Sequence, residues 1–129
     1  MIYYTKVTRN VPVGYNPGQK YLCAIVRSAP ISQEQLCDRV AAASSLAYND
    51  VLSAIAALQM EIVDATMSGQ SVQLDQLGLF TPYLNVKAVE TAEEADVTTI
   101  KRTKINFVPN QRFKNRLKTV GYTYKEVIP

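Results

Sequence analysis

The sequence has 129 residues, of which 47% are hydrophobic, and a formal net charge of +3. This length predicts one domain with a sizeable core. Because no apolar run is long enough to cross a bilayer and the first residues lack the form of a signal peptide, we expect a cytoplasmic protein that does not contact a membrane. Cys23 and Cys37 are too few for a disulfide framework and lack metal-ligand spacing, so we interpret both as buried or half-buried packing residues.

The charge is unevenly distributed along the chain. Residues 1–31 carry four basic side chains and no acidic one, and residues 97–129 carry eight basic side chains against Glu126 alone. The middle is acidic, since residues 32–69 and 70–96 each contain five acidic side chains and one basic side chain. A basic segment can mark a nucleic-acid surface, although a solvated face is the commoner explanation of a single run of charge.

Two strands are predicted at the N-terminus. Residues 2–9 are rich in β-branched and aromatic side chains, and residues 20–27 have the same character. Between them, residues 13–18 contain the glycine, asparagine and proline that favour a loop. We therefore expect a hairpin, which alone would be marginally stable and must pack on something else.

Two helices follow the hairpin. Ser32 and Gln35 form a capping-box pattern, which opens a helix that runs to about Ser44. Asn49 or Asp50 is predicted to cap a longer helix that runs to residue 68. Its apolar residues recur at helical spacing over much of its circumference: Val51, Leu52, Ile55, Ala56, Leu58, Ile62, Val63 and Ala65. Such a helix lies in the centre of a core or between two subunits.

The stretch over 69–80 is interpreted as the point where helices give way to strands. Gly69 suits the left-handed position that closes a helix. Residues 72–74 alternate between apolar and polar side chains, as in a strand. In the turn that follows, Gly78 permits a tight bend or a close approach of two backbones. An apolar strand then resumes and includes Phe80.

The remaining elements complete an α+β pattern. They are a strand at 81–89, an exposed acidic loop at 90–96, a strand at 97–107, a helix at 111–118 that ends near Gly121, and a tail at 122–129 without a clear element. Ile105 and Phe107 share one face of their strand. Asn110 is a suitable N-cap for the last helix, whose apolar stripe is Phe113 and Leu117.

From Ser32 onward, this order of elements resembles the bacterial HU/IHF family of histone-like DNA-binding proteins. Gly69-Gln-Ser-Val-Gln-Leu is similar to the family's gly-x-x-val-x-leu stretch. Leu77-Gly-Leu-Phe80 is similar to its phe-gly-x-phe turn, with Leu77 in place of the usual aromatic residue. Phe107 and the segment 108–117 resemble the family's core phenylalanine and its short basic C-terminal helix.

The added N-terminal hairpin is similar to the divergent HU-related proteins of Bacteroidetes grouped as HU-HIG, and this resemblance is the closer one. It implies a β-hairpin extension over 1–31, an HU-like domain over 32–121 and a C-terminal tail over 122–129. The family's fold implies an intertwined α+β homodimer, in which two helices of each subunit form the body. A three-stranded antiparallel sheet from each subunit forms a saddle and extends an arm around DNA, and the protein acts in the nucleoid.

The expected arm departs from the family pattern in two respects. It is shorter, and no proline lies between Pro82 and Pro109, so the wedge by which HU kinks DNA is missing. The expected basic tip is replaced by acidic residues, which repel phosphates: Glu90, Glu93, Glu94 and Asp96. We therefore do not expect a full HU-like bend of the DNA.

If DNA is bound, contact is expected at the base of the arm and along the last helix. The candidate residues are Lys101, Arg102, Lys104, Arg112, Lys114, Arg116 and Lys118. By resemblance, Lys114 falls on a usually basic position that faces the saddle, whereas Val108 and Gln111 fall on two others and carry no charge. Such phosphate contacts have low sequence specificity. The alternative is an HU-fold structural or protein-interaction module that has lost DNA binding, and both hypotheses stay open here.

Other functions find little support in the sequence. Tyr3, Tyr4 and Tyr21 lie in predicted strands, so we interpret them as sheet-packing residues rather than as base-stacking residues. The chain contains no histidine, and neither cysteine has a histidine partner. We therefore expect no catalytic residue, metal ion, cofactor or small-molecule substrate.

Overall fold

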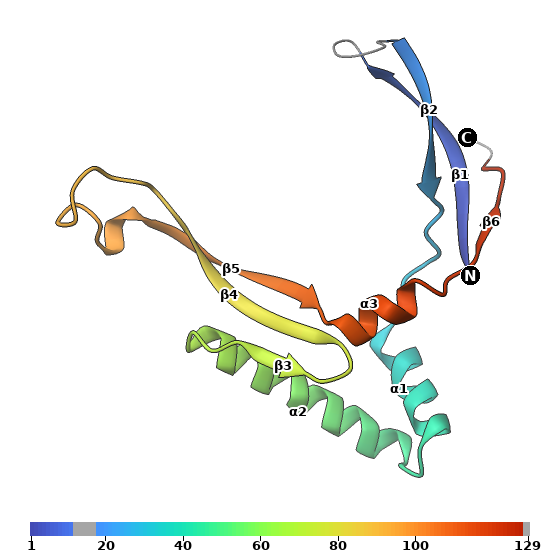
Figure 1. Ribbon diagram of the computed structural model, residues 1–129. Coiled ribbons are helices and arrows are strands. Elements are labelled where there is room, and N and C mark those ends of the chain that lie inside the picture. Colours follow the sequence, from blue (N-terminus) through green and yellow to red (C-terminus); the bar gives the residue numbers. More distant parts are fainter. Residues whose placement is uncertain (12–17, 128–129) are drawn as a thin grey trace. The chain divides into compact units, whose positions relative to one another are not determined.

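The computed structural model describes residues 1–11 and 18–127. They form two compact units, whereas the length predicts one domain. The sheet unit is Met1–Pro30 together with the segment from Arg116 onward, and the body unit is Ile31–Asn115. The elements are β1 (Ile2–Val11), β2 (Gly18–Ile25), α1 (Gln33–Ala43), α2 (Tyr48–Met67), β3 (Val72–Leu74), β4 (Gly78–Val86), η1 (Val97–Thr99), β5 (Ile100–Pro109), α3 (Gln111–Leu117) and β6 (Tyr122–Tyr124) (Figure 1).

The two long helices of the body unit begin in different ways. At α1 the predicted capping box is present: Ser32 Oγ accepts from the backbone N–H of Gln35 at 3.2 Å, and Gln35 Oε1 accepts from that of Ser32 at 3.1 Å. The predicted cap of α2 at Asn49 or Asp50 was wrong, because the N-cap is Ala47 and no side chain caps the helix. Asp50 lies instead in the first turn, where the helix dipole favours a carboxylate.

Gly69 closes α2 as the sequence predicts. Its φ is 82°, in the left-handed region. The N–H of Gly69 donates to the carbonyl oxygen of Thr66 at 3.1 Å, and the N–H of Gln70 donates to that of Ala65 at 3.0 Å. This pair of bonds is a Schellman motif, which satisfies carbonyl groups at the helix end and turns the chain toward β3.

The body unit contains an antiparallel sheet of order β3-β4-β5. Gly78 is the first residue of β4 and lies opposite Pro109 of β5. A Cβ at Gly78 would lie 2.1 Å from the carbonyl oxygen of Val108 and 2.8 Å from Cα of Pro109. The predicted close approach of two backbones at Gly78 is therefore confirmed, and only glycine fits there.

β4 and β5 continue past β3 as a two-stranded arm (Figure 1). β4 ends at Val86 rather than at residue 89, and β5 begins at Ile100 rather than at residue 97. The reason on the second strand is a 3-10 turn over Val97–Thr99, capped by Asp96, whose Oδ1 accepts from the N–H of Thr98 at 3.0 Å. The acidic segment 90–96 lies between the two strand ends.

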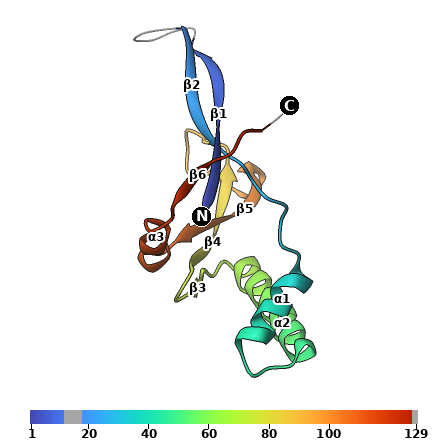
Figure 2. The same ribbon diagram turned by 90° about the vertical axis from the view of Figure 1, so that its right-hand side faces the viewer.

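The sheet unit contains three strands in the order β2-β1-β6. β1 and β2 form the predicted antiparallel hairpin. The loop predicted over 13–18 lies outside the described residues, except for Gly18. β6 pairs in parallel with β1, with Tyr122 opposite Ile2 (Figure 2). The prediction that no element follows Gly121 was therefore wrong, because a short strand that pairs with a remote one has no local signal.

Few apolar side chains are buried in the single chain. Among the described residues, Cys37 and Val51 are buried apolar side chains and Thr66 is a buried polar one. The prediction of a sizeable core was thus wrong for one chain, and Cys23 on β2 is exposed, not buried or half-buried. No helix in the described part of the chain is long and apolar enough to span a membrane.

Replacing Gly78 by alanine should lower the free energy of unfolding by about 3 kcal/mol or more, because the new methyl group collides with backbone that cannot move away. Gly69→Ala is the control: its Cβ meets no atom within 4 Å, so only the left-handed backbone is penalised, by about 1 kcal/mol. Urea unfolding measures both, and an equal loss in the two variants would contradict the close approach.

Candidate nucleic-acid interface

The register of β4 and β5 gives the arm two faces of different chemistry. Residues opposite each other share a face, and faces alternate along each strand. One face, here called the polar face, carries Thr81 opposite Asn106, Tyr83 opposite Lys104 and Asn85 opposite Arg102. These residues are hydrogen-bonding or basic, and none is acidic. Toward the base of the arm, the polar face ends at Leu79 and Val108.

The other face of the arm is apolar and packs in the body unit. Phe80 lies opposite Phe107, with ring centroids 4.9 Å apart, and the Phe107 ring contacts Phe113 of α3 edge-on at 6.4 Å. Farther out, Pro82, Leu84 and Thr103 line a hollow with Thr66 and Met67 of α2, and Tyr83 of the polar face lines the same hollow. The apolar face therefore packs in the body unit at the base of the arm, whereas Leu84 and Ile105 farther out are 52% and 53% exposed.

The structure brings together two of the three predicted basic residues of β5. Arg102 and Lys104 are two residues apart and lie on the polar face, with Arg102 exposed and Lys104 half-buried. Lys101 has no partner in the ladder, since pairing passes from Arg102–Asn85 directly to Ile100–Val86. Such an extra residue bends its strand and strengthens its twist. Lys101 therefore does not belong to the regular alternation that places Arg102 and Lys104 on the polar face.

The end of the arm has the opposite charge. Asp96 Oδ1 accepts from both the N–H and the hydroxyl of Thr98, at 3.0 and 2.5 Å. These hydrogen bonds hold the pKa of the Asp96 carboxyl below its ordinary value, so it is ionised at neutral pH. Glu90, Glu93 and Glu94 are nearby in the sequence, and Lys87 is the basic residue next to them, so the end of the arm carries a net negative charge.

α3 is fixed to the body unit through Asn110. The Oδ1 of Asn110 accepts from the N–H of Phe113 at 2.9 Å, so the predicted N-cap is confirmed, and its Nδ2 donates to the carbonyl oxygen of Asp75 at 2.7 Å. Arg112 and Lys114 precede and follow Phe113, so they leave the helix on two sides of its packed face. Arg116 and Lys118 belong to the sheet unit.

Sequence reasoning missed the uncharged members of the polar face. Tyr83, Asn85 and Asn106 carry no charge and belong to no motif, so a search for basic residues passes over them. The available signal was alternation: in 81–86, Thr81, Tyr83 and Asn85 alternate with more apolar residues.

The sequence matches the model of a family described as an HU domain fused to wHTH, Ig, or glycine-rich motif, HU-HIG, over residues 1–124. The chain belongs to the HU-HIG family. The resemblance stated from the sequence is therefore confirmed. The matched region includes both the N-terminal hairpin and β6, so the family model covers all three strands of the sheet unit.

Two solved structures are similar to this HU-HIG chain. A protein from Bacteroides vulgatus ATCC 8482, provisionally named as a bacterial DNA-binding protein, superposes with a TM-score of 0.69 at 14% identity, covering 95% of this chain and 47% of that one. This chain thus spans about half the length of the Bacteroides protein. A point mutant of HU from Thermotoga maritima superposes with a TM-score of 0.52 at 21% identity, covering 67% of this chain and 99% of HU. These likenesses show an HU-like α+β fold, and no curated protein matches the sequence.

Asn110→Ala should lower the free energy of unfolding by about 2 kcal/mol, because it removes a helix N-cap and a hydrogen bond to the β3–β4 turn. Amide exchange should also become faster in α3. Asn115→Ala is the matched control within α3: its side chain is exposed and bonds only Gln111, so the expected change is within about 0.5 kcal/mol. Equal losses in the two variants would show that Asn110 does not hold the helix.

Proposed function

We propose that this HU-HIG chain is a histone-like, nucleoid-associated protein that binds DNA with low sequence specificity as a homodimer in the cytoplasm. The observation that carries the proposal is the polar face of the arm, where Arg102 and Lys104 stand among neutral hydrogen-bonding side chains with no acidic residue between them. Cations bind phosphates, and short polar side chains can donate to phosphate and sugar oxygens.

Low specificity follows from the type of contact. Contacts to phosphates fix the position of a protein on DNA but carry no sequence information, and the proposed contacts are of this kind. The anionic end of the arm would be repelled by the DNA backbone, so contact is proposed for the base and middle of the arm. Lys114 and Arg112 of α3 extend the proposed surface, with Lys101 at its outer margin and Arg116 and Lys118 as further candidates.

The homodimer is proposed from the apolar surface of α2. One stripe, which includes Val51 and Ile55, packs inside the body unit. A second stripe lies on a different side of the helix, spaced at i, i+4, i+7 and i+11: Ala56, Met60, Val63 and Met67. Met60, Val63 and Met67 are 67%, 52% and 80% exposed in the single chain. A helix that is apolar on so many sides needs a second partner, and a second copy supplies the same stripe.

A second candidate function is an HU-fold structural or protein-interaction module that does not bind DNA. It is favoured by the charge of the body unit, where residues 31–115 contain ten acidic and seven basic side chains, and by the acidic end of the arm. In this case Arg102 and Lys104 are solvated surface residues, and the exposed apolar side chains serve the assembly alone.

Alanine at Arg102 and Lys104 should weaken binding to a random-sequence DNA duplex and flatten its salt dependence. Each lost phosphate contact reduces the slope of log K against log salt by about 0.9. Fluorescence anisotropy between low and moderate salt measures this slope. Arg39→Ala removes one positive charge from α1 of the same unit and should leave the slope unchanged. Absence of binding by the unmodified protein at low salt would favour the second candidate function.

Val63→Glu should convert a dimer into monomers or partly unfold it, because it buries a charge in the second apolar stripe of α2. Ala54→Glu adds the same charge at an exposed position on another side of α2, beside Asp50 and Glu61, and should leave the dimer intact. Sedimentation velocity at micromolar concentration distinguishes the two species. A folded monomer for the unmodified protein would refute the proposed assembly.

A further inference from the structure

The two units of the chain differ in charge and in aromatic content. The sheet unit contains seven basic residues against Glu126, whereas the body unit contains seven basic against ten acidic residues. Five tyrosines lie in the three strands of the sheet unit: Tyr3, Tyr4, Tyr21, Tyr122 and Tyr124. The larger positive balance therefore lies outside the polar face of the arm, in the unit that contains the tyrosine-rich sheet.

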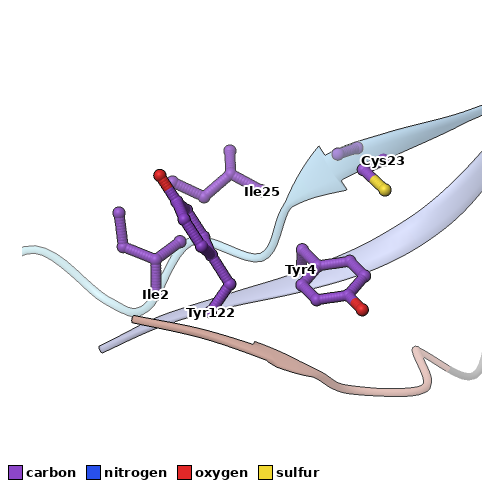
Figure 3. A pocket seen from close by; sticks show the side chains of 6 residues that line it. Ile2, Tyr4, Cys23, Ile25 and Tyr122 are labelled. Carbon is purple, nitrogen blue, oxygen red and sulfur yellow. The ribbon is translucent and has the colours of Figure 1, made fainter. Parts of the chain in front are cut away.

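Four of these tyrosines share one face of the sheet. Opposed residues place Tyr4 with Ile25 and Tyr124, Ile2 with Tyr122, and Tyr21 with Thr8. Alternation along the strands then assigns one common face to Ile2, Tyr4, Lys6, Thr8, Tyr21, Cys23, Ile25, Tyr122 and Tyr124, here called the tyrosine face. Figure 3 shows Ile2, Tyr4, Cys23, Ile25 and Tyr122 around a hollow on this face of about 470 Å³.

The tyrosine face is open within its unit. Among the described residues, the sheet unit is built from three strands, and no helix packs across them. Tyr21 and Tyr122 are 75% and 69% exposed. The prediction that Tyr21 is a packing residue does not hold within the unit, whereas Tyr4 does pack, edge-on against Tyr124 with 5.8 Å between ring centroids. Exposed rings that gather with apolar side chains on one face mark a candidate binding surface.

Cations lie beside two other tyrosine rings of the sheet, Tyr124 and Tyr3. The Nζ of Lys6 is 5.4 Å from the ring centroid of Tyr124 on the tyrosine face, and the Nζ of Lys125 is 5.6 Å from that of Tyr3 on the opposite face. A cation held at a ring can meet the phosphate that follows a base stacked on a neighbouring ring. Open aromatic rings with nearby cations are the arrangement by which sheets bind unpaired nucleotides.

We infer that the tyrosine face is a binding surface for single-stranded DNA, distinct from the polar face of the arm. Tyr21 and Tyr122 supply faces on which unpaired bases stack, and Lys6, together with the positive field of the sheet unit, attracts the phosphates. The charge favours this occupant. Lys6 lies on the tyrosine face itself, and the other basic residues of the unit lie on the opposite face or outside the strands. An apolar hollow alone would fit a protein, but a unit with seven basic residues and one acidic residue attracts a polyanion. Duplex DNA presents no free base faces, so the unpaired strand is the fitting form.

The test measures binding of fluorescent oligothymidylate of about 12 nucleotides by anisotropy at low salt. Tyr21→Leu and Tyr122→Leu remove the rings but keep apolar side chains, and Tyr21→Phe and Tyr122→Phe keep the rings. Each leucine variant should weaken binding by at least about fivefold, because stacking is lost. Each phenylalanine variant should bind within about twofold of the unmodified protein, which also shows that the sheet tolerates substitution there.

Duplex binding, measured in the same variants, separates this inference from the proposed function. The leucine variants should bind duplex DNA as the unmodified protein does. Arg102→Ala should bind duplex DNA more weakly but bind oligothymidylate as the unmodified protein does. No binding of oligothymidylate at low salt, or equal binding by the leucine and phenylalanine variants, would overturn the inference. Binding of oligouridylate but not of oligothymidylate would overturn the assignment to DNA.

Discussion

At Gly78 the first residue of β4 lies against the last residues of β5 with no side chain between them. Three features depend on this contact. Because Gly78 has no Cβ, the backbone of Asn110 comes close to the β3–β4 turn, where its N–H donates to the carbonyl oxygen of Leu77 and its Nδ2 to that of Asp75. The register of the arm is counted from Gly78–Pro109, so the contact decides which residues share a face. The Phe80–Phe107–Phe113 cluster forms two residue pairs farther along the same ladder. A shift of one residue would exchange the polar and apolar faces of the arm.

Charge and aromatic residues are distributed differently in the arm and in the sheet unit. The arm separates a basic, hydrogen-bonding middle from an acidic end along a single pair of strands, so its attraction for phosphates is confined to part of its length. The sheet unit has the opposite character, with a high positive balance and exposed rings. The two proposed surfaces therefore select different forms of DNA by different physics, since one responds to phosphate charge alone and the other also requires an unpaired base.

Local sequence rules predicted most of the helix caps and the tight turn of this chain correctly. Ser32 with Gln35, Gly69 and Asn110 each cap a helix end through neighbours only a few residues away, and all three behave as predicted. Gly78 also behaves as predicted, although the backbone that it approaches is about 30 residues away. Apart from the N-cap of α2 and the start of β5, the failures have non-local causes. β6 exists because β1 lies beside it, and the exposure of Cys23 and Tyr21 depends on whether another element covers the sheet. The facing of Arg102 and Lys104 required the register with β4, which a run of basic residues does not contain. The start of β5 failed for a local reason, because the Asp96 cap on a 3-10 turn was not recognised.

The parallel pairing of β6 with β1 has a consequence for the order in which the protein folds. It joins positions about 120 residues apart, a closure that costs about 4 kcal/mol of chain entropy, whereas the β1–β2 hairpin closes locally. During synthesis the hairpin therefore forms early, and one edge of β1 stays unpaired until Tyr122–Tyr124 has been made. An unpaired strand edge accepts any compatible strand. Nascent copies are close together on a polysome, so β6 of one copy can pair with β1 of another. Correct folding must be faster than this exchange of strands.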